Sequence, residues 1–432
     1  MRRKKQSISL GSVISAAAVA YGTYKVADWA WNRYVTKRKK NDYQVNAAIA
    51  TSFMNFLCSQ TSVGAHAEDG VASHIDHIPG PNRRLRMRRQ RMTRCRQEAA
   101  QALRGFSPAL RSIVELHTNT AQATRLLKQL RANRTTEKHA TSRRSEEQAL
   151  WKEIQRKTMT RMLTTAYAHT ILFLVLTTQV NLLGGRLFEE SLQNTSLSSN
   201  VSMSNDSVAS DRMVSYQESH RFVLQHTYDY FLNKGVHSLL STVEQAVDSV
   251  LGGWNVFDKA CLHISREQFD CALVKIRGLI EGGLRTDVSR TSGRSSRRES
   301  ILRFLMPSSI LEHSIQDDLA RSILDETWDL VESPVFSDAQ QECLNATFAS
   351  MRDRFWGKIF DDNGLSGTKP WAHVLTQLRT TSNSFFVENT QRKDYDSAHS
   401  HQSKTLDSPA SIYCTMLETL PAVLELNDVS FN

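Results

Sequence analysis

Apolar and polar residues repeat at three- and four-residue steps along most of this chain, which is the period of an amphipathic helix. Alternating runs of the kind that form strands are few. Two stretches show the helical period most clearly, the first through Val236, Leu239, Leu240, Val243, Val247, Val250 and Leu251, the second through Leu344, Phe348, Met351, Phe355 and Ile359. The pattern therefore predicts an all-α protein built as a large, elongated helical bundle.

The most apolar long stretch runs from Trp151 to Gly185, and it has no charged residue between Arg161 and Arg186. Its length would be enough for a membrane span. Polar side chains interrupt it, however, at Thr164, Thr165, His169, Thr170, Thr177, Thr178, Gln179 and Asn181. Because a helix facing lipid would not carry so many polar groups, the stretch is predicted to be a buried core helix. The pair Gly184–Gly185 is expected to end it.

A second apolar stretch, near the N-terminus, has the residue order of a single membrane anchor. The basic cluster Arg2–Lys5 precedes the uncharged segment Ile8–Tyr24, and the aromatic residues that follow are themselves followed by the basic run Lys37–Lys40. The residues expected to face the membrane are Ile8, Val13, Ile14, Val19 and Tyr24. A cleaved secretory signal and an arginine-rich organelle presequence are the alternatives to an anchor.

Breaks in the helical pattern divide the chain into three parts. Residues 1–40 form the anchor with its basic flanks, residues 41–82 form a linker that ends in the helix-breaking sequence PGPN, and residues 83–432 form a cytosolic helical domain. Polar segments predict disordered loops near residues 191–211, 285–299 and 381–409. Within the domain we also expect a helix break at Gly105–Pro108, helices over Ser265–Ile280 and Ser411–Leu426, and a helix end at Glu332–Pro334.

Charge and cysteine content narrow the possible partners and compartments. The 432 residues carry a net charge of +10, so an anionic surface is a natural partner, and the six cysteines are widely spaced, which indicates reduced thiols in the cytosol. Eight of the fourteen residues of Arg83–Arg96 are arginine, so a helix here would be positively charged on nearly every face. The segment has neither aromatic platforms nor a recognition motif, which favours an anionic membrane surface over nucleic acid.

Sequence patterns of catalytic chemistry are absent from the chain. It contains no glycine-rich phosphate loop, no HExxH or GxSxG motif and no cluster of cysteine ligands. The histidines His66, His74 and His77 lie beside acidic residues but do not have the spacing of a zinc site. We therefore expect no enzymatic activity, no cofactor, no bound metal and no small-molecule substrate. A membrane-tethered helical scaffold that binds another protein is the remaining interpretation.

Three separated motifs resemble the peroxin-3 family. The first is QVNLLGGRLF, Gln179–Phe188, whose first glycine follows Trp151 by 33 residues; the second is LDETWDLVESPVF, Leu324–Phe336; the third is CLNATF, Cys343–Phe348. The resemblance implies a docking receptor in the membrane of the peroxisome, or of a relative such as the glycosome, with most of the chain in the cytosol. Such a receptor binds the chaperone peroxin-19 and so allows the insertion of peroxisomal membrane proteins.

The resemblance also implies where the partner binds. In the family, a hydrophobic groove takes up the amphipathic N-terminal helix of peroxin-19, and the central tryptophan of that groove matches Trp151. Leu150, Ile154 and Thr158 share its side of a helix. Lys369 is the nearest match for a lysine that borders the groove. Two alternatives stay open: Trp151 is only a core residue, or the chain is a basic, membrane-tethered protein of another organelle that binds lipid or nucleic acid through Arg83–Arg96.

Overall fold

The structure is a computed structural model, and all the residues that it describes belong to one compact unit of the chain, Leu57–Asn432. The described residues are 80–132, 140–198, 223, 227–258, 262–282, 302–305, 318–360, 367–384 and 416–431. The anchor residues Ile8, Val13, Ile14, Val19 and Tyr24, and nearly all of the 41–82 linker, lie outside these ranges. The described part is almost entirely helical, which confirms the all-α prediction.

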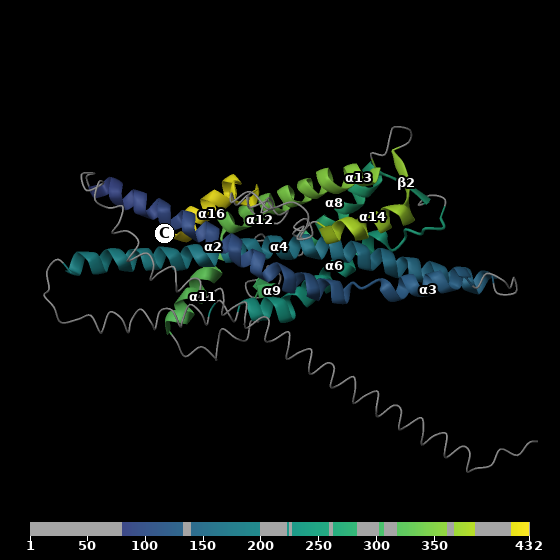
Figure 1. The fold of residues 1–432 in the computed structure, drawn as a ribbon, viewed down its shortest axis with the longest axis horizontal. Helices are drawn as coiled ribbons and strands as arrows, with labels where there is room; N and C mark the ends of the chain where they lie inside the picture. The colour runs from purple at the N-terminus through teal and green to yellow at the C-terminus, as the bar shows by residue number, and fades with distance from the viewer. Residues whose placement is uncertain are drawn as a thin grey trace, which may run out of the picture. The chain divides into compact units, whose positions relative to one another are not determined.

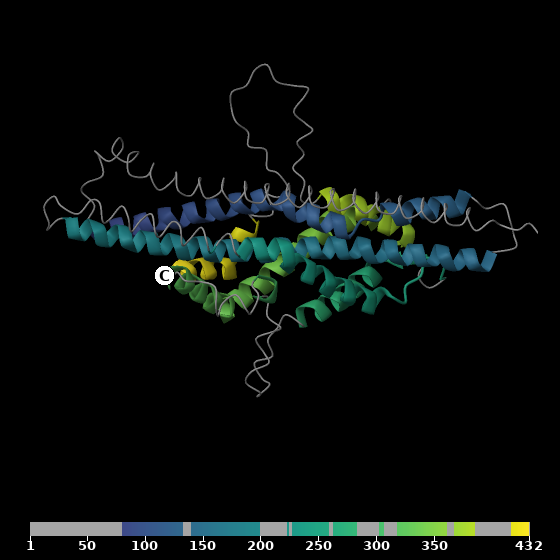
Figure 2. The same ribbon diagram turned by 90° about the horizontal axis from the view of Figure 1, so that it is seen from below.

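The helices pack around a long central helix, α4 (Ala140–Ser198), as Figure 1 shows. Contacting it are α2 (Gly80–His117), α3 (Ala121–Ala132), α6 (Val236–Leu251), α11 (Asp318–Val331), α12 (Pro334–Met351), α14 (Trp371–Ser384) and α16 (Pro421–Phe431). Figure 2 shows α2 and α3 along one side of α4, with α11 and α16 on the other. The remaining elements are η3 (Phe231–Gly235), β1 (His263–Ser265), α8 (Arg266–Gly282), α9 (Leu302–Leu305), η5 (Arg352–Trp356), α13 (Gly357–Phe360) and β2 (Thr368–Pro370).

The burial of α4 confirms that it is a core helix of this fold. Among the described residues it is also the one helix long and apolar enough to cross a membrane, and 89% of its most apolar window is buried in the protein. Its polar side chains face neighbouring helices rather than lipid. Tyr228 Oη donates to Gln179 Oε1 at 2.6 Å, and Asn181 Nδ2 donates to Asn427 Oδ1 at 2.6 Å. The polar interruptions in the sequence therefore cross-link α4 to distant segments, because buried polar groups require partners.

The glycine pair Gly184–Gly185 does not end this helix, so the predicted helix end is wrong. α4 continues through both residues to Ser198, past the start of the predicted 191–211 loop. A β-carbon on Gly184 would lie 2.3 Å from Cys95 Sγ of α2, and one on Gly185 would lie 2.3 Å from the Phe431 carbonyl oxygen of α16. The glycines therefore allow α2 and α16 to approach α4 closely.

Helix α2 also differs from the prediction, because it runs unbroken through Pro108. Proline lacks the N–H that a helix interior uses and normally breaks or kinks it. Here Phe106 and Leu110 are buried on either side of it, and the Ser107 hydroxyl donates to the Leu103 carbonyl oxygen at 2.7 Å. Tertiary packing therefore outweighs the local preference of proline against a helix interior.

The basic segment Arg83–Arg96 at the start of α2 also differs from the prediction. Met92 and Cys95 are buried, so the helix is not positively charged on every face.

The second amphipathic stretch is interrupted by a π-helix. α11 ends at Val331, which confirms the helix end predicted at Glu332–Pro334. Ser333 then caps α12, since its hydroxyl accepts from the Phe336 backbone N–H at 3.2 Å. Leu344, Phe348, Met351 and Ile359 are all buried, as the spacing predicts. The π-helix η5 changes the register after Met351, and Trp356 enters the core. The position of the Phe355 side chain is not among the described features.

Three further elements test the predicted boundaries. α6 buries its predicted apolar face except for Val250, which is half-buried, and α8 matches the predicted helix Ser265–Ile280. The predicted helix Ser411–Leu426 is interrupted: residues 416–418 are helical, a turn follows at Thr419, and α16 then runs from Pro421 to Phe431, while residues 411–415 lie outside the described ranges. An antiparallel pair of short strands, β1 and β2, was not predicted, with His263 opposite Pro370, Ile264 opposite Lys369 and Ser265 opposite Thr368. Strands of three residues are too short to show an alternating pattern.

Candidate partner-binding site

The predicted partner site lies in the first turns of α4. Leu150 is half-buried, whereas Trp151, Ile154 and Thr158 are buried, and Trp151 keeps 8% of its surface exposed. The spacing of these residues places them along one side of the helix. Both α3 and α14 pack against α4. The structure thus brings the four residues together on a largely covered face, with Leu150 nearest to solvent.

An arginine from α3 lies over the indole of Trp151. The Arg131 guanidinium carbon is 5.6 Å from the centre of the Trp151 ring, within the range of a cation–π interaction. Arg131 Nε also donates to Glu147 Oε1 at 2.8 Å, and Glu147 lies one turn before Trp151 on α4. Arg131 therefore joins α3 to the start of α4 and covers part of the tryptophan.

The Trp151 indole N–H is buried and has no hydrogen-bond partner among the described residues. Buried donors are nearly always paired in native proteins, because a lost hydrogen bond to water is not replaced otherwise. Packing as an apolar core residue thus leaves the buried indole N–H of Trp151 unexplained. Sequence reasoning identified Trp151 by its distance from a motif, but no sequence pattern indicated Arg131 as its neighbour.

A buried glutamine fixes the next turn of α4. Gln155 Nε2 donates to the Leu251 carbonyl oxygen at 2.7 Å, and Trp371 Nε1 donates to Gln155 Oε1 at 2.8 Å. The Trp371 ring also contacts Trp254 edge to face, with centroids 5.2 Å apart. Gln155 thereby ties α4 to the end of α6 and the start of α14. The sequence signal that could have found it is its position one turn after Trp151.

Lys369 belongs to β2, directly before α14. It pairs with Ile264 of β1 and is half-buried. Because Trp371 follows it by two residues and is bonded to Gln155, β2 is held at the end of α4 that carries Trp151. Figure 1 shows β2, α14 and α3 at this same end of α4. The structure therefore places Lys369 in the same region as the tryptophan.

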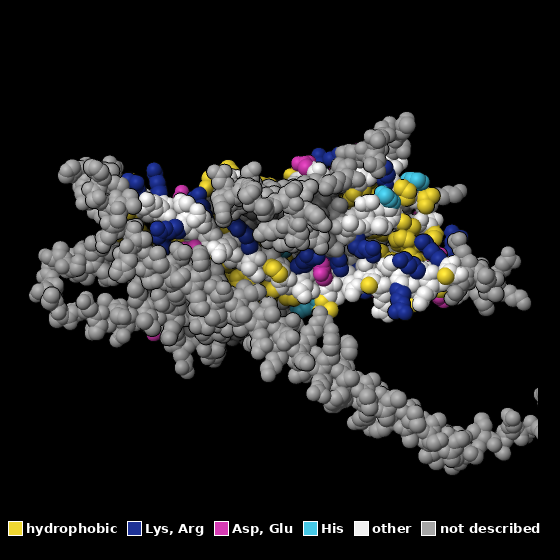
Figure 3. All heavy atoms as spheres, viewed as in Figure 1, with side chains coloured by type: hydrophobic (Ala, Val, Ile, Leu, Met, Phe, Trp, Pro, Cys, Tyr) yellow, Lys and Arg dark blue, Asp and Glu magenta, His cyan; other side chains and the backbone are white. Residues whose placement is uncertain are grey.

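Basic and apolar side chains are mixed on the surface around this region. Figure 3 shows hydrophobic side chains among Lys and Arg side chains where α3 and α14 lie. Leu126 of α3 is an exposed large apolar residue, and the Arg144 guanidinium lies 5.9 Å from the centre of the half-buried Phe257 ring. Such a mixture of apolar and cationic groups suits an amphipathic partner with acidic residues.

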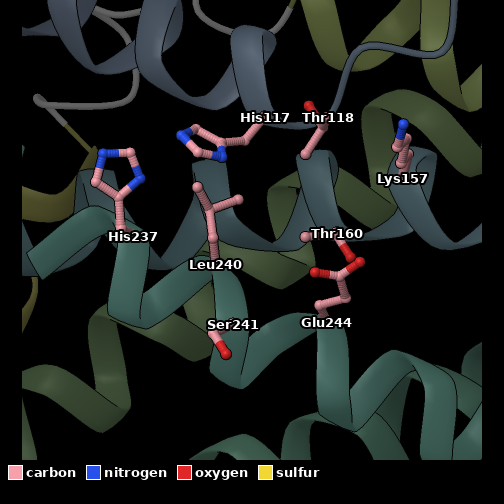
Figure 4. A pocket seen from close by; sticks show the side chains of 8 residues that line it. All are labelled: His117, Thr118, Lys157, Thr160, His237, Leu240, Ser241 and Glu244. Atoms are coloured by element: carbon pink, nitrogen blue, oxygen red, sulfur yellow. The ribbon is translucent and has the colours of Figure 1, made fainter. Parts of the chain in front are cut away.

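A separate pocket of about 220 Å³ lies between α2, α4 and α6. Figure 4 shows its lining, which consists of His117, Thr118, Lys157, Thr160, His237, Leu240, Ser241 and Glu244. The imidazoles of His117 and His237 meet edge to face with centroids 4.3 Å apart. Partial burial, and to a smaller extent the neighbouring His117, lowers the pKa of His237. None of the predicted partner-site residues lines this pocket.

The two charged groups of the pocket, Lys157 and Glu244, already have partners outside it. Lys157 Nζ lies 2.5 Å from Glu153 Oε1, and Glu244 Oε1 lies 2.9 Å from Arg156 Nε. Across all the described ranges, no group of three or more His, Cys, Asp or Glu side chains has the arrangement of a metal site. The pocket therefore gives no charge pattern that selects one class of ligand.

The free thiols in the described part of the chain are Cys95, Cys271 and Cys343. Burial raises the pKa of Cys95 to about 12 and raises the pKa of Cys343 further. Both therefore stay protonated and unreactive at neutral pH. Cys271 is exposed on α8. These features fit structural thiols rather than a nucleophilic site.

Comparisons with known proteins match most of the chain to one family. The family model described as Peroxin-3 matches residues 36–423. A mouse protein named peroxisomal biogenesis factor 3 is 26% identical over 253 residues, which cover 57% of this chain and 59% of the mouse protein. The rat and human proteins of the same name are each 25% identical, with the same coverage. The alignments thus span about three fifths of these relatives.

Proposed function

Because the chain belongs to the peroxin-3 family, we propose that it acts in the biogenesis of the peroxisomal membrane, as a docking receptor for the chaperone peroxin-19. The observation that carries the proposal is the family match over residues 36–423, which includes both the Trp151 region and the three motifs. The names of the mouse and human relatives support the peroxisomal role. A related organelle such as the glycosome is the alternative site of action.

In this proposal the amphipathic N-terminal helix of peroxin-19 docks at the start of α4. Leu150, Trp151 and Ile154 supply the apolar side, Thr158 lies one turn further along it, and Lys369 lies at the border. A mostly buried tryptophan within a polar rim is typical of the residues that dominate binding energy at an interface. Leu126 is a further exposed apolar residue, on α3. Recognition then follows the general rules of a helix binding in a groove.

The remaining parts of the chain have supporting roles in the proposal. Residues 1–40 anchor the protein in the membrane, residues 41–82 connect the anchor to the helical domain, and the helical domain lies in the cytosol. The exposed arginines of Arg83–Arg96 would contact anionic headgroups, since α2 begins at Gly80, within the last three residues of the linker. No catalytic step, cofactor or small-molecule substrate forms part of this function, and nucleic acid is not a partner.

Binding of a synthetic peroxin-19 N-terminal peptide to the full chain in lipid nanodiscs tests the proposal. Trp151→Ala should weaken binding by about 2 kcal/mol, as expected for a tryptophan that dominates an interface. Val274→Ala is a suitable control, because Val274 is an exposed apolar residue on α8, which supplies no residue to the proposed docking site. Equal affinities of wild type and Trp151→Ala would exclude the start of α4 as the docking site.

The response of binding to salt distinguishes the proposed function from the alternative, which is binding of lipid or nucleic acid through Arg83–Arg96. Affinity for nucleic acid should fall steeply as salt increases, because phosphate contacts release counterions. Apolar docking of a helix should change far less. Strong, salt-sensitive binding of nucleic acid without any binding of the peroxin-19 peptide would favour the alternative.

A further inference from the structure

The Trp151 indole N–H is a hydrogen-bond donor at the proposed docking site that lacks an acceptor. Its nitrogen is buried and unpaired among the described residues, and the whole side chain is more than nine-tenths buried. Leaving such a donor unpaired is costly, so a native site that keeps one is suited to a ligand that supplies an acceptor. The acceptor must come from outside the described part of the fold.

Arg131 covers the same tryptophan and is held by an acidic residue. Its guanidinium carbon lies 5.6 Å from the ring centre, and its Nε donates to Glu147 Oε1 at 2.8 Å. The Arg131 side chain is 48% exposed, whereas the Glu147 side chain is only 16% exposed. The arginine therefore has solvent on its outer side and can move, whereas the carboxylate that holds it is fixed against the protein.

The surface around this pair carries an excess of positive charge. The exposed or half-buried basic residues of α3 and the start of α4 are Arg125, Lys128, Arg131, Arg143, Arg144 and Lys152, against the acidic residues Glu146, Glu147 and Glu153. A negatively charged partner is attracted to such a surface. A carboxylate on the partner would satisfy both features, because it is attracted to the positive surface and can accept the hydrogen bond of the indole N–H.

We propose that the docking helix of the partner presents a carboxylate that replaces Glu147 as the acceptor for Arg131 and also accepts the Trp151 indole N–H. This inference rests on the proposed function, because it assumes that the partner docks at Trp151. On docking, Arg131 swings from the face of the indole toward the incoming carboxylate, and an apolar residue of the partner takes its place. Arg131 and Glu147 then determine specificity, with Glu147 as a built-in competitor of the partner.

The exchange explains why the two residues should have opposite effects on affinity. Arg131 exchanges its hydrogen bond to Glu147 for one to the partner, and its positive charge also offsets the repulsion between the two carboxylates in the complex. The net gain is the new bond to the indole N–H and the contact of an apolar side chain with the uncovered ring. Removing the charge of Glu147 should therefore strengthen binding. If Glu147 had a purely structural role, the same substitution would weaken binding.

The test measures the affinity of the full chain in nanodiscs for two peptides. One is the N-terminal helix of peroxin-19, and the other is the same peptide with each Asp and Glu replaced by Asn and Gln. Glu147→Gln should tighten binding of the first peptide by about fivefold, and Arg131→Met should weaken it by about tenfold, as expected for charge-assisted hydrogen bonds. Neither variant should alter binding of the amide peptide, which itself binds more weakly.

Arg321→Met is the matched control. Like Arg131, Arg321 is about half exposed, at 50%, and pairs with an acidic residue, which here is Asp318 of the same helix. It lies on α11, and its loss should leave the affinity unchanged. Trp151→Phe, which keeps a ring but lacks the N–H, provides a second measure and should reduce the preference for the acidic peptide. Thermal unfolding of each variant shows whether it is folded.

The outcomes separate this inference from the proposed function. If Trp151→Ala abolishes binding while Glu147→Gln and Arg131→Met leave it unchanged, the docking site stands and the carboxylate exchange is overturned. Weaker binding by Glu147→Gln would also overturn it, because Glu147 would then support the site. If Trp151→Ala has no effect on the affinity, the proposed function fails and the inference fails with it.

Discussion

The carbonyl oxygen of Phe431 occupies the space that a β-carbon on Gly185 would need, since the two would be 2.3 Å apart. Gly185 lies in the interior of α4, and Phe431 is the last residue of α16. Because the obstacle is a backbone atom of a packed helix, it cannot rotate away as a side chain could. At this position α16 therefore approaches the central helix too closely to leave room for a side chain on Gly185.

Replacing Gly185 with alanine should therefore destabilise the fold. We expect Gly185→Ala to lower the free energy of unfolding by about 3 kcal/mol, because α16 must shift outward to admit the methyl group. Gly278→Ala on α8 is the matched control, since a β-carbon there meets nothing within 4 Å. It should stabilise the helix by about 0.5–1 kcal/mol. Urea unfolding measures both, and equal effects of the two substitutions would contradict the packing argument.

The Gln155 bridge should be as important to stability as an apolar core residue. Gln155→Met preserves the length of the side chain but leaves the Leu251 carbonyl oxygen and the Trp371 indole N–H without this partner. We expect a loss of about 2–3 kcal/mol in thermal unfolding, because two buried groups lose their hydrogen bonds. Gln129→Met, at an exposed position of α3, is the control and should have little effect. Retained stability in Gln155→Met would show that water replaces the bridge.

Acid should weaken the fold through His169, which is buried in the middle of α4. Burial lowers its pKa from the ordinary value of 6.5 to about 4, although the hydrogen bond to the Thr165 carbonyl oxygen partly opposes the shift. The folded protein thus holds His169 neutral, while the unfolded chain takes up a proton below pH 6.5. Neutral His169 therefore makes its full contribution to the free energy of unfolding above pH 6.5. As the pH falls toward 4 this contribution is lost, and the free energy of unfolding decreases by about 3 kcal/mol in total.

Urea titrations across this pH interval, with wild type and His169→Gln, check that prediction. The variant cannot take up the proton, so its stability should fall less steeply over the interval than that of the wild type. The difference between the two curves isolates the histidine from the acidic groups that also titrate. Parallel curves would show that His169 is not held neutral by the fold.

The membrane anchor is tested by the localisation of residues 1–40 joined to a fluorescent protein. We expect this segment to reach the peroxisomal membrane or that of a glycosome, and to resist extraction with alkaline carbonate. Changing Val13 and Ile14 to aspartate should release it, since charges are costly in the bilayer. Changing Ser12 and Ser15 to alanine is the control and should leave it bound. Mitochondrial localisation would favour the presequence alternative.

Local periodicity was sufficient to predict helices whose apolar faces lie within one element. The stripe of α6 and the burial of α4 follow from residue spacing and from the hydrophobic effect. Gly184 and Gly185 show where such reasoning ends. A glycine pair fits both a helix end and a close helix contact, and the choice depends on Cys95 and Phe431, which no local pattern links to them.

The candidate site shows the same division. Trp151 was found by its distance from a motif, and the helical period grouped Leu150, Ile154 and Thr158 with it. Arg131 and Trp371 come from other helices, and the Trp371–Gln155 bond joins residues 216 positions apart. Contacts of that kind depend on how helices are placed in space. A single sequence does not contain that information in its local composition, so these two residues could be found only from the structure.

The bond between Asn181 and Asn427, which lie 246 positions apart, has a consequence for synthesis on the ribosome. At about 5–20 residues per second, the apolar half of α4 leaves the ribosome roughly 12–50 s before α16 exists to cover it. During that interval the nascent chain displays a helix with the length and hydropathy of a membrane span. We expect this segment to need shielding from membranes until α16 and the other late helices are made and cover it.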